Sequence, residues 1–406
     1  MKLVPFDHAE LRLGEPLPVP LHDGSGRLLA VAGAVLRDAE RFASLARQGL
    51  YTDVRAALEW KRRIGAAMDA KLRQNAVLEE VANARPDTAV RARGHDERPL
   101  ALAWEESVDQ IDALLREAQR APLVDWPQRL AALHAQARAL LERRSDASLY
   151  LLVYEAGQSP PKHCAHHAAL SMAICELAAP LLGWPEEAAT SLALAALTMN
   201  VAVQRLHDQL ALGEREPTPA MRAEIAAHPR AGVRLLEAAG VTDRMLLDIV
   251  AQHHETAPAE PPSTELTAEL PMARRLAALL TRVDGFADRV SRRAVGEPLS
   301  PAQAVREMCL GADGMPDEVG GALLKAVGLY PPGSFVELAS GEIGIVVARG
   351  RRANLPYVAT LVAAGGTPLG VPALRDTIER RHAVKAPVPS ARVRVRPPHE
   401  RLIAMR

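Results

Sequence analysis

Aromatic residues are scarce in this sequence. Phe, Trp and Tyr make up 3% of the 406 residues, although 48% of the chain is hydrophobic. The core must therefore be built mainly from alanine, leucine and valine, a composition that favours packed helices over a β-sandwich. A chain of this length can bury a sizeable core and form two or three domains. We therefore expect a mainly α protein.

The sequence also has few cysteines, no net charge and no long apolar run. Three scattered cysteines are too few for a disulfide framework or a thiolate zinc site, and they fit a reduced, cytoplasmic setting. Equal numbers of basic and acidic residues, 49 of each, leave no overall field to attract nucleic acid or an anionic membrane. No uninterrupted apolar run reaches the ~18 residues that span a bilayer, and residues 1–5 do not resemble the start of a signal peptide. We expect a cytoplasmic protein that neither inserts into membranes nor binds nucleic acid.

Prolines, glycines and shifts in composition divide the chain into four predicted parts. They are a small α/β N-terminal module, a helical connector, a helical domain, and a C-terminal β appendage with a tail, at residues 1–55, 56–144, 145–328 and 329–406. The N-terminal module is expected to contain a helix at 38–49, and the connector a polar linker near 84–99. The C-terminal part is expected to open with a β-hairpin at 335–347.

The third part has the apolar spacing of a helical bundle. Asp243 is a suitable N-cap, and Pro229 is expected to separate two helices because proline lacks an amide hydrogen. The predicted helices cover residues 145–156, 164–182, 186–206, 218–226, 230–239, 243–255, 271–292, 300–309 and 317–327.

Histidines are concentrated in this part. Seven of the thirteen in the chain lie between His163 and His254. Several of them, and the carboxylate Asp284, are each expected on the apolar side of a different helix, which is how helical bundles build metal sites. A single buried histidine is more often part of the core than a metal ligand. The residues alone leave both interpretations open.

A longer pattern in residues 145–375 resembles the HD-GYP domain, a bacterial branch of the HD superfamily of metal-dependent phosphohydrolases. The resemblance rests on His167 with Leu182-Gly183 downstream, on His228-Pro229-Arg230-Ala231-Gly232, on His253-His254-Glu255, on Asp284 and Arg293, and on Tyr330-Pro331-Pro332-Gly333 followed by Gly341-Glu342.

The resemblance implies an HD-type helical bundle and a role in cyclic di-GMP signalling, because the family hydrolyses that messenger. It implies a centre of two metals bridged by the Asp of a His-Asp pair; with the departures described below, the residues retained here form a partial site for one divalent metal, Fe, Mn or Zn, with a cyclic dinucleotide as ligand. The residues that it assigns are the metal ligands His167, His228, His253, His254 and Asp284, and a phosphate-binding Arg293.

The sequence departs from the family where most of the chemistry lies. Met199 and Asn200 stand at the name-giving His-Asp pair, and Val203 stands at the lysine that follows. The Gly-Tyr-Pro segment is absent from residues 256–265. A neutral amide cannot bridge two cations as a carboxylate does, and a thioether is a poor ligand for Fe, Mn or Mg. The valine also lacks the ammonium group that would hold phosphate.

Other residues could compensate for these losses. His207-Asp208 could be a displaced His-Asp pair, and His163 or His166 could contribute ligands to a remodelled site. The alternative is a metal-free core, in which the Asn200 amide is expected to hydrogen-bond to Asp284 or His167 because a buried amide needs partners.

Three functions follow from these alternatives. The first is a catalytically impaired HD-GYP-type protein that regulates or scaffolds signalling through protein partners or a bound cyclic dinucleotide. The second is an active metal-dependent phosphohydrolase with a rearranged site, acting on cyclic di-GMP or another phosphoester. The third is a structural adaptor whose terminal modules carry partner surfaces. In the first and third cases the metal could be absent.

Overall fold

The computed structural model describes residues 3–15, 17–30, 49–73, 99–120, 125–158, 161–213, 216–254, 270–293, 298–311 and 313–405. The chain forms two compact units, Met1–Arg98 and Pro99–Arg406. The four-part division predicted from the sequence is finer than this and stays a prediction. The expected helix at 38–49, nearly all of the linker near 84–99 and the segment 256–265 lie outside the described residues.

The described residues of the first unit form a small antiparallel sheet and one long helix. The strands are arranged in the order β1-β4-β2-β3, and an apolar core that includes Leu17, Leu21 and Trp60 is buried there. The elements are β1 (Leu3–Pro5), β2 (Leu21–His22), β3 (Leu28–Ala30), β4 (Tyr51–Asp53) and α2 (Val54–Arg73).

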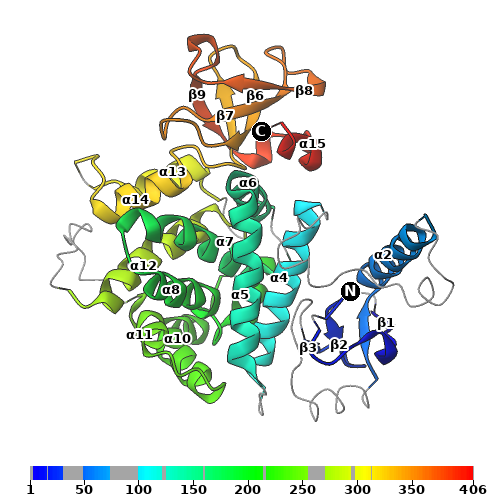
Figure 1. Ribbon diagram of the computed structural model, residues 1–406. Helices are drawn as coiled ribbons and strands as arrows, with labels where there is room; N and C mark the ends of the chain where they lie inside the picture. Colours follow the sequence, from blue (N-terminus) through cyan, green and yellow to red (C-terminus); the bar gives the residue numbers. More distant parts are fainter. Residues whose placement is uncertain are drawn as a thin grey trace. The chain divides into compact units, whose positions relative to one another are not determined.

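The second unit is a helical bundle (Figure 1). Its helices are α4 (Leu100–Glu117), α5 (Trp126–Arg143), α6 (Ser145–Ala156), α7 (His163–Ala178), α8 (Glu186–Thr198), α9 (Gln204–Leu212), α10 (Pro219–Ala238), α11 (Arg244–Gln252), α12 (Met272–Val290), α13 (Pro301–Cys309), α14 (Glu318–Val327) and α15 (His399–Ile403). Helix α7 lies at the centre and packs against α4, α6, α8, α12 and α14.

The central position of α7 explains its composition. The segment His163–Leu182 is long and apolar enough to cross a membrane by length and composition, a match that the search for an uninterrupted apolar run missed. The apolar side chains of α7 are buried among the neighbouring helices, whereas Leu181, beyond its end, is 51% exposed. The segment therefore has the composition of a core helix.

Two helix predictions are wrong. The segment 186–206 is not one helix, because α8 ends at Thr198 and α9 begins at Gln204 after a turn. Conversely, Pro229 does not separate two helices, since α10 runs from Pro219 through it to Ala238. Both differences alter the histidine site.

The C-terminal part is an antiparallel sheet in the order β8-β7-β6-β5-β9. Its strands are β5 (Phe335–Leu338), β6 (Ile343–Ala348), β7 (Tyr357–Val362), β8 (Pro368–Asp376) and β9 (Val384–Val388). The expected hairpin is β5–β6, with Phe335 opposite Ile345. Arg349 joins the sheet to α6 through Asp146 at 2.5 Å and Ser145 at 3.0 Å. The described part of the chain is mainly α with two small antiparallel sheets, which confirms the predicted fold class.

Candidate metal centre

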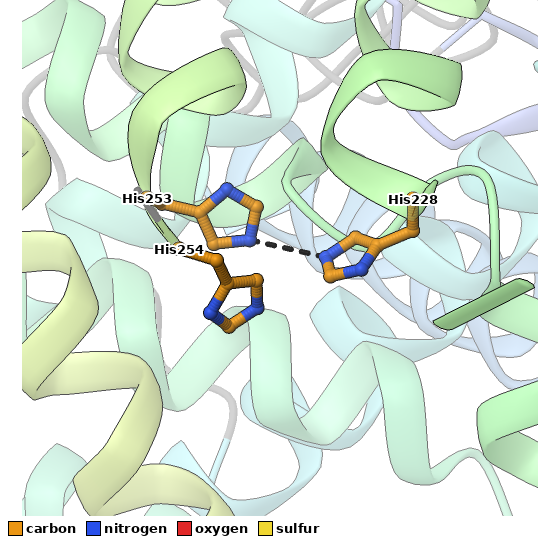
Figure 2. Close-up of side chains that lie close together, drawn as sticks. All are labelled: His228, His253 and His254. Atoms are coloured by element: carbon orange, nitrogen blue, oxygen red, sulfur yellow. Dashed lines mark hydrogen bonds between the residues drawn. The ribbon is translucent and has the colours of Figure 1, made fainter. Parts of the chain in front are cut away.

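Three histidines, His228 of α10 and His253 and His254 just after α11, meet at the centre of the site (Figure 2). The ligand atoms of His228, His253 and His254 all lie within 4.8 Å of one another. His228 and His253 are 2% and 0% exposed, whereas the His254 side chain is 46% exposed. Two buried imidazoles and one that reaches the surface give a site that is both preformed and accessible.

The orientation of His228 follows from the residue after it. Pro229 has no amide hydrogen, so the carbonyl oxygen of Ile225, four residues earlier, has no helical partner. The His228 ring uses that oxygen, since its Nδ1 donates to Ile225 O at 2.5 Å. Nε2 is thereby turned toward the other histidines. The proline inside α10 is thus part of the site, and sequence reasoning treated it only as a break.

His253 is oriented by the end of its helix. Its Nδ1 donates to the Val250 carbonyl at 2.7 Å, one of the carbonyls that lack a partner in the last turn of a helix. The Thr281 hydroxyl, from α12, donates to the His253 carbonyl at 2.5 Å. This tether was not evident from the sequence.

These two hydrogen bonds determine what the facing nitrogens can do. The Nε2 atoms of His228 and His253 are 3.1 Å apart. Each ring has its proton on Nδ1, so both Nε2 atoms carry lone pairs in the neutral state. A shared proton would require an imidazolium, but burial, together with His254, lowers the pKa of His253 to about 3, and burial also lowers the pKa of His228. Two facing lone pairs are stabilised by a cation, and imidazole Nε2 atoms fixed through Nδ1 are typical metal ligands.

A second group lies beside the first. His167 Nε2 donates to Asp284 Oδ1 at 2.8 Å, and Asp284 Oδ2 lies 3.9 Å from His254 Nε2. Burial acts to raise the pKa of Asp284, but the hydrogen bond from His167 and the nearby imidazoles hold it well below its usual range. Asp284 is therefore an anion at neutral pH that connects His167 with the three-histidine group.

Met199, Asn200 and Val203 lie in the turn between α8 and α9. All three are buried. The turn fits closely against α10, because a Cβ at Gly232 would lie 3.6 Å from the Met199 carbonyl oxygen. Among the described residues, the Asn200 amide forms no hydrogen bond with Asp284 or His167, so the expected pairing is wrong. Asp284 instead accepts a hydrogen bond from His167.

His207 and Asp208 face different surroundings. Asp208 accepts hydrogen bonds from the Cys164 amide at 3.0 Å, Gln204 at 3.0 Å and Arg116 at 2.8 Å. It is therefore engaged in holding helices together and cannot act with His207 as a displaced His-Asp pair. The His207 ring lies 6.3 Å from the His228 ring, centroid to centroid.

The remaining candidates lie around this group. The His163 ring is 6.2 Å from the His167 ring, and burial followed by His167 lowers its pKa to about 2. Arg293 forms an ion pair with Asp288 and lines a cavity of about 350 Å³ next to β5 and β9. The role of Arg293 in binding phosphate stays a prediction.

One comparison with known proteins agrees with the resemblance seen in the sequence. The chain is 24% identical over 301 residues, 73% of its length, to the cyclic di-GMP phosphodiesterase PA4108 of Pseudomonas aeruginosa, of which the match covers 70%. No family model matches the chain. Bd1817, an HDG"Y"P protein of Bdellovibrio bacteriovorus, aligns with 80% of this chain and 99% of its own with a TM-score of 0.44 and 13% identity, a similarity too low to carry an argument.

The sequence match, together with the helical bundle that holds the histidines, supports an HD-GYP-type domain in this chain. The donor set fits a divalent metal, because imidazoles and a carboxylate suit Fe, Mn or Zn. Such a cation would act as a Lewis acid on phosphate oxygens or bound water.

Proposed function

We propose that this chain is a catalytically impaired HD-GYP-type protein that acts as a regulatory or scaffolding module in cyclic di-GMP signalling. Its relative is a cyclic di-GMP phosphodiesterase, which supports a cyclic dinucleotide as ligand. Protein partners receive the signal. A cytoplasmic location fits the three buried cysteines, none of which forms a disulfide.

The observation that carries the proposal is the turn between α8 and α9. Two-metal hydrolysis of a phosphodiester needs an anion that lowers the repulsion between the cations and helps to position the attacking hydroxide. The side chains at that turn are the thioether of Met199 and the amide of Asn200, both buried. A cation can still be held by His228, His253 and His254. The residues that can bind one cation are thus retained, whereas the carboxylate that would couple two metals is missing.

Hydrolysis and binding should therefore separate in an assay. Wild-type protein loaded with Mn²⁺ or Fe²⁺ should bind cyclic di-GMP but hydrolyse it negligibly, while Met199→His/Asn200→Asp should gain turnover. The matched control is His254→Ala in the double mutant, which should abolish that gain. Wild-type turnover similar to that of an intact family member, and lost in His254→Ala, would contradict the proposal.

One observation favours a second candidate, an active phosphohydrolase with a rearranged site. Asp284 contacts His167 at 2.8 Å and lies 3.9 Å from His254, so a carboxylate does connect the two ligand groups. This candidate predicts tightly held metal in protein purified without added metal. Less than about one equivalent of metal would count against it.

A further inference from the structure

A cavity of about 680 Å³ lies between α4, α6, the first turn of α7 and the C-terminal segment that contains α15. Helix α15 packs against α4 (Figure 1), and its His399 Nδ1 lies 2.9 Å from the Tyr150 hydroxyl of α6. The volume is that of a small-molecule site. The five metal ligands that the resemblance assigns lie outside its lining. We infer that this cavity binds a small organic cation, an ammonium or guanidinium group on an apolar body.

The inner wall of the cavity is apolar. It is formed by Trp104 and Val108 of α4 and by Leu151 and Leu152 of α6, and each of these side chains is at most 4% exposed. The Trp104 indole N–H donates to Ser148 Oγ at 3.0 Å, so the ring presents only carbon atoms to the cavity. An aliphatic or aromatic body packed against this wall would lose its contact with water, which favours binding.

Acidic side chains are in excess around the cavity. Lys162 and Asp109 form an ion pair with each other, which cancels one charge of each sign. The other charged residues of the lining are three carboxylates and one guanidinium, Glu105, Glu155, Glu400 and Arg396. With the histidines neutral, three negative charges against one positive charge leave an excess of two negative charges. The cavity therefore attracts a cation and repels an anion.

Glu155 is the carboxylate placed to receive that cation. It lies in the last turn of α6 and is half-buried, and among the described residues its side chain forms no hydrogen bond or ion pair. Burial, followed by the charge of Glu105, raises the pKa of Glu155, and Arg396 acts in the opposite direction. The ionised carboxylate is therefore less stable here than in water. A cation bound in the cavity would stabilise it.

A bare metal ion fits this cavity less well than an organic cation. Among the described residues, only His228, His253 and His254 bring three ligand atoms within 4.8 Å of one another. The carboxylates around the cavity are thus too dispersed to supply the oxygen ligands that a metal ion needs. An ammonium or guanidinium group needs one carboxylate, and its body would cover the apolar wall. The inference is independent of the metal centre and of the proposed function.

Three probes that share one body and differ in charge test the inference on metal-free full-length protein. They are phenylbutylamine, phenylbutanol and phenylbutyrate, which at neutral pH carry a positive charge, no charge and a negative charge. Calorimetric titration should show one site for the amine, with the alcohol bound at least about 10-fold more weakly and the carboxylate more weakly still. Because this comparison uses the wild type, it does not depend on the folding of a variant. Similar affinities for the three probes, or no binding of the amine, would overturn the inference.

Two variants locate the bound cation. Glu155→Gln keeps the shape of the side chain and removes its charge, so the affinity for phenylbutylamine should fall at least about 10-fold while that for phenylbutanol is unchanged. Glu105→Gln, an exposed change on α4, should lower the amine affinity about 2- to 5-fold. The matched control is Glu307→Gln on α13, an exposed carboxylate outside the cavity, which should leave it unchanged. Unchanged amine affinity in both Glu155→Gln and Glu105→Gln would refute this site.

Discussion

At the scale of single residues, Pro229 contributes through the hydrogen that it lacks. The free Ile225 carbonyl accepts the Nδ1 proton of His228 at 2.5 Å, which turns Nε2 toward His253. An alanine at this position would restore an amide that competes for the same carbonyl. Because Pro229 cannot donate this helical hydrogen bond, the Ile225 carbonyl oxygen stays available to accept the hydrogen bond that orients His228.

Pro229→Ala should weaken metal binding while sparing the fold. We expect the affinity for Zn²⁺ to fall about 10- to 100-fold, the range for losing an outer-sphere partner. The free energy of unfolding of the metal-free protein should stay equal or rise, since α10 gains a hydrogen bond. Calorimetric zinc titration and urea unfolding measure the two effects.

The same helix offers the control. Pro219 is exposed at the first position of α10, where a missing amide hydrogen costs nothing. Pro219→Ala should leave zinc affinity unchanged. Equal affinities for Pro229→Ala and wild type would show that the Ile225 hydrogen bond does not orient the ligand.

At the scale of secondary-structure elements, the start of α7 is held from outside its own sequence. Lys162, which precedes the helix, provides no side-chain cap. Asp208 from α9 accepts the Cys164 amide at 3.0 Å instead, and a carboxylate at this end also suits the helix dipole. The position of His163 and His167 thus depends on α9.

Asp208→Asn should therefore destabilise the bundle. The amide keeps an acceptor for Cys164 but loses the charge opposite Arg116, and we expect the free energy of unfolding to fall by about 1–3 kcal/mol. Urea unfolding monitored by circular dichroism measures the loss. Glu142→Gln, which removes an exposed ion pair with Arg138, is the control and should cost below about 0.5 kcal/mol. Similar values for both would contradict a stabilising role for the Asp208 charge opposite Arg116.

The elements show how far sequence reasoning reaches. Apolar spacing located α6 at 145–156 and α12 within 271–292, because the buried side of a helix requires apolar residues at the helical spacing. It failed at Pro229 and at the turn after Thr198, where contacts between distant helices decide the backbone. Proximity of His228 and His253 followed from the family pattern, whereas the tether from Thr281 and the position of His207 depend on tertiary packing that no local pattern encodes.

At the scale of the whole molecule, buried histidines make stability depend on pH. Burial is the largest cause that lowers the pKa of His163 to about 2, of His166 to about 4, and of His207 and His253 to about 3. Their unfolded value is 6.5. Below pH 6.5 the unfolded chain therefore binds protons that the folded chain does not. The contribution of these histidines to the free energy of unfolding is complete above pH 6.5. It is lost as the pH falls toward their pKa values in the folded state.

Urea unfolding of the metal-free protein at pH 7.5, 6 and 5 tests this. Each of these histidines contributes a slope that approaches about 1.4 kcal/mol per pH unit between its two pKa values. Asp284 acts in the same direction only as the pH falls below its unfolded value of 3.8. His166→Gln should reduce this slope by the contribution of one histidine. A free energy of unfolding that is constant from pH 7.5 to 5 would contradict the burial of these rings.

The joining of α10 to the end of α11 through His228 and His253 has a topological consequence. A cation on these side chains would be a cross-link that closes the intervening segment into a loop, as a disulfide does. Loops of this size, closed by a covalent link, restrict the unfolded chain by about 3 kcal/mol in the chain-entropy model. Bound metal would then make the helical bundle more rigid. Such a change in rigidity is a signal that does not depend on hydrolysis of a substrate.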